Sequence, residues 1–168
     1  MQELFEKFDI KINHRDDYER TVVHYLFNDD NSSATIDVSL IKLVLSKNPD
    51  INAKDCLNRT PMHYLFVKIN DEYISEQIDP IVSLTSLIDL KGIDVEVQDY
   101  FGNTVLHYAA QRGASICSMA LVEKAPSLVN VKNAENNTAF AYFLVFGHPN
   151  YSVILMQKNA NVIDFINP

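Results

Sequence analysis

Glycine, positive charge and long apolar runs are scarce in this sequence, and each shortage argues against a class of function. Only four of its 168 residues are glycine, too few for a glycine-rich loop that holds a phosphate group. Lysine and arginine total 14 against 22 aspartates and glutamates, for a net charge of −8. This balance argues against nucleic-acid binding and against an anionic membrane surface, because both attract clustered basic residues. The longest apolar run, 139–146, is far shorter than the roughly 20 residues that span a bilayer.

Cysteine is equally scarce, with only Cys56 and Cys117 in the chain. Their separation matches no metal-binding or redox motif. The first eight residues, M-Q-E-L-F-E-K-F, lack the basic start and apolar stretch of a secretory signal. Two distant cysteines without such a signal predict reduced thiols in an intracellular protein, cytoplasmic or nuclear. Hydrophobic residues nevertheless make up 47% of the sequence, which predicts a packed core.

One stretch of the sequence carries a pattern that recurs along the chain. Residues 99–113 read D-Y-F-G-N-T-V-L-H-Y-A-A-Q-R-G, and an apolar helical pattern follows over 116–122. Aligned on Thr104, three weaker copies occur at spacings of 39, 44 and 34 residues and begin at Thr21, Thr60 and Thr138. Such self-similarity indicates a repeat architecture, in which each unit packs only on its neighbours.

This stretch resembles the ankyrin repeat, whose pattern is T-P-L-H-x-A-A-x-x-G. The matching residues are Thr104, Leu106, His107, Ala109, Ala110 and Gly113, while Val105 stands where proline is usual. The resemblance implies an all-α solenoid of helix-turn-helix units joined by short β-hairpin-like turns. It also implies a binding module and not an enzyme. The sequence shows no nucleophile elbow and no plausible catalytic triad, and we expect neither a cofactor nor a metal.

The resemblance predicts a single ankyrin-repeat domain over residues 1–168. Residues 1–13 are the end of a partial unit, and the four repeats are 14–53 (repeat one), 54–97 (repeat two), 98–132 (repeat three) and 133–168 (repeat four). First helices are predicted near 21–28, 60–68, 104–112 and 138–146. Second helices are predicted near 38–46, 81–90, 115–124 and 151–157. Neither end has the polar cap of a complete solenoid, so we expect a segment of a longer protein.

Each repeat is predicted to open with a hairpin. Five residues before each threonine stands a residue that can bond its own backbone in a turn: Asp16, Asp55, Asp99 or Asn133. Two residues before each threonine the turn needs a positive φ, which suits glycine and, less well, asparagine. The residues at that position are Glu19, Asn58, Gly102 and Asn136. Because glutamate fits it poorly, we expect a strained or rebuilt turn in repeat one.

Repeats one and two depart from the family pattern in two ways. Insertions at 28–35 and 70–79 lie between their helices and should form a shared acidic rim of Asp29, Asp30, Asp37, Asp71, Glu72, Glu76 and Asp79. The rim is either tolerated loop length or a feature that selects a basic partner segment. Bulky pairs, Leu26-Phe27 and Leu65-Phe66, replace the two alanines. Such pairs imply wider helix spacing or a rotated first helix.

Histidine and tyrosine recur at the repeat spacing. His24, His63 and His107 have no second metal ligand nearby in sequence, and the family resemblance implies that they bond neighbouring hairpins. A tyrosine follows that position in every repeat: Tyr25, Tyr64, Tyr108 and Tyr142. In an ankyrin array this position lies on the first helix, toward the concave groove. Tyrosine there can serve recognition or can pack between first helices, and both roles stay open.

The hairpin tips add four further candidates for partner contact: Tyr18, Leu57, Tyr100 and Phe101. Together with the four helix tyrosines they predict a surface that binds a partner protein or peptide in the concave groove. A second hypothesis follows from the H-Y-L-F phrases and long insertions of repeats one and two, which are similar to ankyrin regions of invertebrate tankyrase-related poly(ADP-ribose) polymerases. This chain would then be the targeting or regulatory arm of an ADP-ribosyltransferase whose catalytic domain lies elsewhere. A purely structural spacer is the third possibility.

Overall fold

The computed structural model describes residues 11–27, 38–68, 87–146 and 148, and within them it is helical with no strand. The elements are α2 (Val22–Phe27), α3 (Val38–Leu45), α4 (Pro61–Lys68), α7 (Val105–Arg112), α8 (Ser115–Lys124), the 3-10 helix η1 (Pro126–Asn130) and α9 (Ala139–Val145). The chain therefore has an all-α repeat fold, as predicted.

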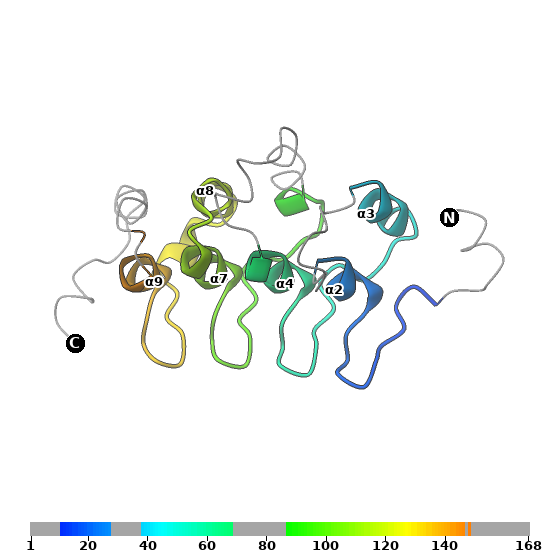
Figure 1. Cartoon of the computed structure of the whole chain (residues 1–168), viewed down its shortest axis with the longest axis horizontal. Helices are drawn as coiled ribbons and strands as arrows, with labels where there is room; N and C mark the ends of the chain where they lie inside the picture. The colour runs from blue at the N-terminus through cyan, green and yellow to red at the C-terminus, as the bar shows by residue number, and fades with distance from the viewer. Residues whose placement is uncertain (1–10, 28–37, 69–86, 147, 149–168) are drawn as a thin grey trace.

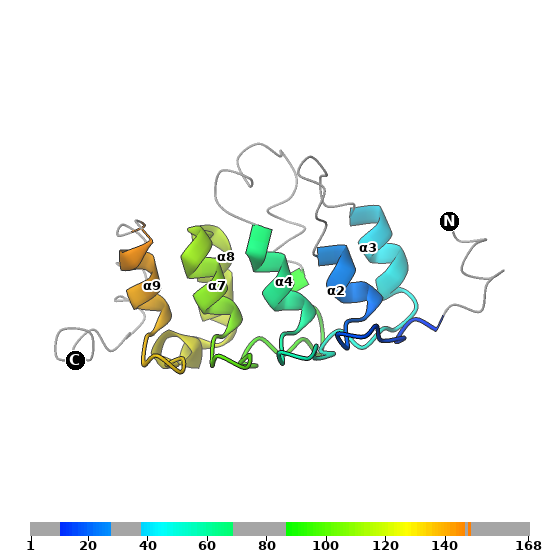
Figure 2. The ribbon, with the colours of Figure 1, turned by 60° about the horizontal axis from the view of Figure 1, so that its bottom comes forward.

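Four helices lie side by side in a row, in the order α2, α4, α7 and α9 (Figure 1). They are the first helices of the four repeats. Helices α3 and α8 form a second layer on one side of the row, and four hairpin-like loops project from the other side (Figure 1). Figure 2, turned by 60°, shows the same four helices still in a row. The hairpins and the first helices therefore share one long side of the molecule.

The helix boundaries follow the sequence pattern closely. All four first helices and the second helices of repeats one and three match the predicted ranges to within about two residues. The predicted second helix at 81–90 lies mostly outside the described residues, and the one at 151–157 lies wholly outside them. The same holds for both insertions and for the acidic rim that they were expected to form. The 3-10 helix η1 follows α8 and contains Leu128, Val129 and Asn130.

Threonine and glycine mark the ends of α7. Thr104 is the N-cap in extended conformation, with φ −92° and ψ 170°, and Gly113 is the C-cap with φ 69°. A Cβ atom at Gly113 would meet the ring of His148 at 2.5 Å, so this position needs glycine for its conformation and for space. Thr138 caps α9 in the same extended conformation. The start of each of these two helices is therefore fixed locally.

The hairpins share one geometry. In each, the amide of the turn residue donates to the carbonyl four residues later at 2.9–3.0 Å. The turn residues and their acceptors are Asp16 with Arg20, Asp55 with Arg59, Asp99 with Asn103, and Asn133 with Asn137. The left-handed position has φ 61° at Glu19, 58° at Asn58, 76° at Gly102 and 65° at Asn136. Repeat one thus keeps the standard turn, with the strain falling on Glu19.

Replacing Glu19 with glycine should raise the free energy of unfolding by about 0.5–1 kcal/mol, because glycine adopts positive φ without a steric penalty. The ion pair lost with Glu19, to Arg15 at 3.7 Å, is exposed on both sides and contributes little. Urea denaturation measures the change. The matched control is Asn58→Gly, where asparagine already tolerates the conformation and the gain should be smaller. A loss of stability in Glu19→Gly would contradict the strain.

The core lies between the two helix layers and along the row. Its largest fully buried side chains include Met62, Leu65 and Phe66 from α4, Leu106 from α7 and Phe143 from α9. The bulky pair of repeat two is therefore core, and in repeat one Phe27 is buried while Leu26 is partly buried against the cluster. The expected effect of these pairs on helix spacing stays a prediction.

Candidate functional site

Each first helix carries a tyrosine whose hydroxyl reaches back to the hairpin. In repeat two the Tyr64 hydroxyl donates to Oδ2 of Asp55 at 2.7 Å. Arg59 donates from Nε to the same Oδ2 at 2.8 Å and from Nη2 to the Tyr64 oxygen at 2.7 Å. The other oxygen of Asp55, Oδ1, accepts the amides of Leu57 and Arg59. One carboxylate therefore holds the turn, the arginine and the helix together.

The other repeats vary this cluster. In repeat one Tyr25 donates to Asp16 at 2.6 Å, and Arg20 bonds both of them. In repeat three Tyr108 donates to Asp99 at 2.8 Å, and Asn103 stands where the arginine was. In repeat four the amide of Asn133 donates to the Tyr142 oxygen at 3.0 Å. The tyrosine position is thus tied to the hairpin in all four repeats.

These bonds shift the acidity of the groups that make them. Burial raises the pKa of Asp55, but the hydrogen bonds from Tyr64 and Arg59 outweigh it, so the pKa lies below its usual value. The same balance lowers the pKa of Asp16. Burial and the bond to a carboxylate raise the pKa of Tyr64 and of Tyr108. The carboxylates therefore stay charged and these two phenols stay neutral at physiological pH.

The motif histidines join consecutive repeats. Nδ1 of His24, His63 and His107 accepts the backbone N–H of the threonine three residues earlier, at 3.0–3.1 Å. Nε2 lies 3.1–3.3 Å from a carbonyl oxygen of the next hairpin, on Arg59, Asn103 and Asn137. A backbone N–H can only donate and a carbonyl can only accept, so each ring is neutral with its proton on Nε2. This confirms the predicted structural role.

Each of these histidine rings also meets the tyrosine of the next repeat edge to face. The ring centroids are 5.3 Å apart for His24 and Tyr64, 5.5 Å for His63 and Tyr108, and 5.4 Å for His107 and Tyr142. Burial lowers the pKa of His63 to about 4 and lowers the pKa of His24 and His107 as well. The three joints therefore hold uncharged imidazoles at neutral pH.

The hairpin tips are joined by a third contact. The amides of Cys56, Tyr100 and Ala134 donate to the carbonyls of Tyr18, Leu57 and Phe101 in the preceding hairpin, at 2.8–2.9 Å. Side chains add to this: Arg15 donates to the Lys54 carbonyl at 2.7 Å, and Gln98 donates to that of Lys132 at 3.2 Å. The four tips form one connected strip.

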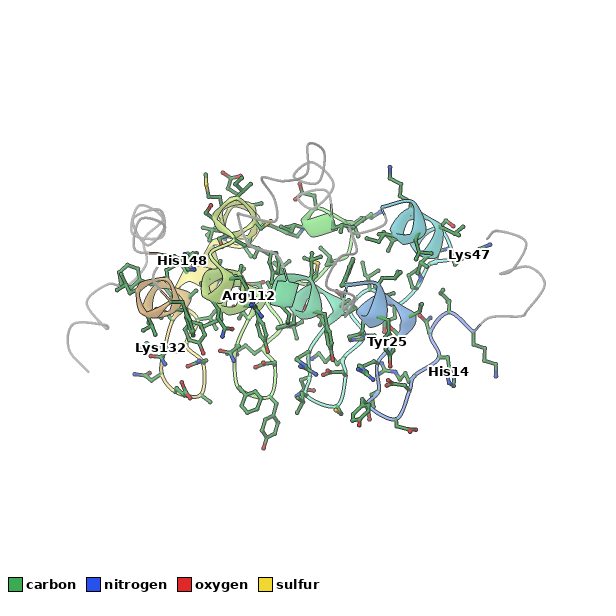
Figure 3. All side chains as sticks on the ribbon, viewed as in Figure 1. His14, Tyr25, Lys47, Arg112, Lys132 and His148 are labelled. Atoms are coloured by element: carbon green, nitrogen blue, oxygen red, sulfur yellow. The ribbon has the colours of Figure 1, made fainter. Side chains whose placement is uncertain are left out.

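The eight residues predicted to contact a partner fall into two groups. Tyr18, Tyr100 and Phe101 are 60%, 70% and 53% exposed at the hairpin tips, and Leu57 is half-buried there. On the first helices Tyr25 is exposed, Tyr108 and Tyr142 are half-buried, and Tyr64 is buried at 4% exposure. Tyr25 lies at the foot of α2 beside the first hairpin (Figure 3). The aromatic rings at the tips are thus exposed, whereas the helix tyrosines range from exposed at Tyr25 to buried at Tyr64.

Sequence reasoning did not identify the partners of these tyrosines. The aspartates were predicted only as turn residues, and Arg20 and Arg59 were not singled out. A usable signal was present, since the tyrosine follows the turn residue by nine positions in all four repeats. The arginines precede the motif threonine in repeats one and two. Only the folded hairpin brings all these side chains onto one carboxylate.

The described part of the chain offers no support for a metal site or a membrane-spanning helix. It holds no group of three or more histidine, cysteine or acidic residues suited to a metal ion. Cys56 is an exposed free thiol and Cys117 a buried one. None of the described helices has the length and apolar character needed to cross a bilayer.

Known proteins resemble this chain through its repeats. The profile of the family described as "Ankyrin repeats (many copies)" matches residues 87–143. The chain is 36% identical over 89 residues to "Poly [ADP-ribose] polymerase tankyrase" of Caenorhabditis elegans, covering 52% of this chain and 4% of that protein. It is 28% identical over 90 residues to human "SMC5-SMC6 complex localization factor protein 1", covering 54% of this chain and 8% of that protein. It is 29% identical over 72 residues to "Ankyrin repeat protein nuc-2" of Neurospora crassa, covering 43% and 7%.

These three matches span less than a tenth of each relative. They therefore concern the repeats and not the remainder of those proteins. Repeats of this kind are typically non-catalytic and generally serve as protein-interaction modules. The hairpin turns and the neutral histidine joints agree with the matched profile, which identifies ankyrin repeats over residues 87–143.

Proposed function

We propose that this chain is a protein-interaction module that binds a partner protein or extended peptide on the side formed by the hairpin tips and first helices. In a solenoid this side is the concave groove. The observation that carries the proposal is the exposure of three aromatic rings on this side, with Tyr18 60%, Tyr100 70% and Phe101 53% exposed. Large aromatic side chains at such sites provide contact area with little rotamer entropy to lose.

The rigidity of the tips supports the proposal. Each tip is closed by its own turn bonds, and the tips of repeats two, three and four are each bonded to the tip before them. The rings of Tyr100 and Phe101 also meet edge to face, with centroids 5.4 Å apart. A preformed surface loses little conformational entropy on binding, so more of the contact energy appears as affinity.

The helix tyrosines then divide by role. Tyr64 is buried, and its hydroxyl and its ring are both committed within the array, which favours packing for that residue. The other three helix tyrosines, Tyr25, Tyr108 and Tyr142, are at least partly exposed to solvent. They therefore contribute the part of the binding surface that lies on the first helices. Partner contact is thus assigned chiefly to the tips, with Leu57 between the two exposed aromatic sites.

The negative charge of this chain indicates which kind of partner segment it would bind. The chain carries a net charge of −8, and the exposed acidic residues at the tips are Asp17, Glu19 and Glu135. These favour a partner segment with basic residues beside apolar ones. Binding of nucleic acid or of an anionic membrane is disfavoured by the same net charge.

The experiment replaces the exposed tip aromatics with serine. Tyr100→Ser with Phe101→Ser should weaken binding to partners at least tenfold and leave the melting temperature within about 2 °C, since exposed side chains contribute little to stability. Partners are first identified with a photo-crosslinking amino acid at position 101 and are then titrated as purified proteins. The matched control carries the crosslinker at Met119 of α8, which is also exposed, at 43%, but lies in the opposite layer (Figure 1). Equal binding by the double variant would contradict the proposal.

A second candidate role rests on the match to the nematode tankyrase. Identity of 36% over 89 residues supports a targeting or regulatory arm of a larger ADP-ribosyltransferase, with the catalytic domain outside this segment. Sequencing the full-length transcript tests the idea directly. A mature protein without a transferase domain eliminates this candidate and leaves the binding role intact.

A further inference from the structure

The hairpin tips use their own backbone amides. We name the three residues after each turn residue the crest of that hairpin; the crests are 17–19, 56–58, 100–102 and 134–136. In repeats two, three and four the first crest amide donates to the preceding hairpin, the second to the side chain of the turn residue and the third to its carbonyl. These three crests therefore leave no amide to pair with an added β-strand, and a partner there is recognised through side chains.

The middle residues of the crests form a row. Its order is Tyr18, Leu57, Phe101 and Glu135, and the carbonyl of each of the first three accepts an amide from the next crest at 2.8–2.9 Å. The first helices that follow these hairpins pack side by side in the same order (Figure 1), and helices packed in this way lie about 8–10 Å apart. The row therefore presents one side chain about every 8–10 Å.

A polyproline II helix matches this spacing. It has three residues per turn and rises about 3.1 Å per residue, so every third side chain lies on one face, about 9 Å apart. A β-strand brings side chains to one face only about 6.5–7 Å apart. The polyproline II helix needs no backbone partner, and it binds aromatic surfaces. The exposed rings of Tyr18, Tyr100 and Phe101 provide such a surface.

Among the crest residues, charge is confined to the two ends of the row. The two inner crests contain no charged residue, whereas the outer crests contain Asp17, Glu19 and Glu135. Glu19 already pairs with Arg15 at 3.7 Å. Asp17 and Glu135 are both exposed, and they favour a basic residue at each end of a bound segment. Lys54, exposed at the start of the second hairpin, disfavours a basic residue between those ends.

We propose that the crests bind a proline-rich segment in the polyproline II conformation. The segment has two apolar side chains three residues apart and a basic residue three positions beyond each. The apolar side chains lie on Leu57 and Phe101, and the basic residues pair with Asp17 and Glu135. The basic residue at Asp17 also covers the exposed ring of Tyr18. This inference rests on the proposed partner surface and deepens it by naming the chemistry of the segment.

Two peptides of one composition test the spacing. The first is Arg-Pro-Pro-Leu-Pro-Pro-Leu-Pro-Pro-Arg, which reads the same in both directions, and the second is Arg-Pro-Pro-Pro-Leu-Leu-Pro-Pro-Pro-Arg. Both are labelled, blocked at their ends and titrated with the whole chain by fluorescence anisotropy. The second should bind at least tenfold more weakly, because only one of its leucines can face the row. A third peptide, the first with glycine for proline, should also bind more weakly, because it is not preorganised.

A charge exchange tests the two ends. Asp17→Lys with Glu135→Lys should weaken binding of the first peptide at least tenfold. The same peptide with aspartate in place of both arginines should bind this variant more tightly than it binds the native chain. Both positions are exposed, so the melting temperature should stay within about 2 °C of the native value.

The proposal would be overturned by equal affinity for the two leucine spacings, by equal affinity for the proline and glycine peptides, or by no binding of the first peptide up to about 1 mM. Undiminished binding of the first peptide by Tyr100→Ser with Phe101→Ser would also overturn it. Failure of the proposed function is read separately, from the partners crosslinked at position 101. If those partners depend on Tyr100 and Phe101 while peptide spacing has no effect, the partner surface stands and the polyproline II segment is wrong.

Discussion

Asp55→Ala is expected to lower the free energy of unfolding by about 3 kcal/mol, which is in the range for removing one partner of a buried ion pair. The Asp55 side chain is fully buried in its pair with Arg59. It accepts two backbone amides, the Arg59 guanidinium and the Tyr64 hydroxyl. Alanine would leave these donors without their acceptor. Urea denaturation followed by far-ultraviolet circular dichroism measures the loss.

Two further variants separate the contribution of the Asp55 charge to stability from that of its bonds to the turn amides. Asp55→Asn keeps an oxygen for the backbone amides but removes the negative charge beside Arg59, so its loss should be intermediate. Asp16→Ala removes the equivalent carboxylate of repeat one, whose side chain is 27% exposed, and should cost less than Asp55→Ala because water can replace it. Equal losses at the two aspartates would show that burial is not the source of the effect.

The second large effect is a loss of stability between pH 6.5 and pH 4. Burial lowers the pKa of His63 from 6.5 to about 4 in the folded chain. Between these values the unfolded chain binds a proton that the folded chain does not, so stability falls as the pH falls. For His63 alone the loss by pH 4 is about 3 kcal/mol at 1.36 kcal/mol per unit. His24 and His107 shift in the same direction and add to it.

Equilibrium unfolding at a series of pH values measures this slope. The control is His63→Asn, which should be less stable at pH 7, because the joint is lost, but should show a shallower dependence over the same window. The aspartates do not add to the slope between pH 6.5 and pH 4. A carboxylate with a lowered pKa, such as Asp55, loses its contribution to the free energy of unfolding only below about pH 4. An unchanged slope in His63→Asn would contradict the assignment.

The sequence predicted local backbone conformation correctly at positions where few residue types tolerate the conformation that the turn requires. Asn58, Gly102 and Asn136 were predicted at positive φ because few other residues tolerate it, and all three adopt it. The threonines marked helix starts for a similar reason. Glu19 shows the limit of this approach, because the bonds from the amides of Tyr18 and Arg20 to the Asp16 side chain close the same turn around a residue that does not favour positive φ.

Tertiary contacts were less predictable. The tyrosine position was recognised as periodic, yet periodicity alone could not separate recognition from packing. The answer differs between copies, since Tyr64 has a histidine from the previous repeat against its ring and Tyr25 has an exposed ring. The carboxylate partners depend on the hairpin folding back beside the helix, which sequence spacing does not describe.

The side-chain bonds that join neighbouring repeats span similar distances along the chain. Those of the histidines, Arg15 and Asn52 join residues 30 to 42 positions apart. Closing a loop of one repeat is therefore the largest entropic step that these bonds require, and it need not grow as more repeats are added. Damage should also stay local: a broken joint divides the array into two cooperative blocks on either side of the break. For a chain built this way, a denaturation curve that splits into two transitions would show that a joint between repeats had failed.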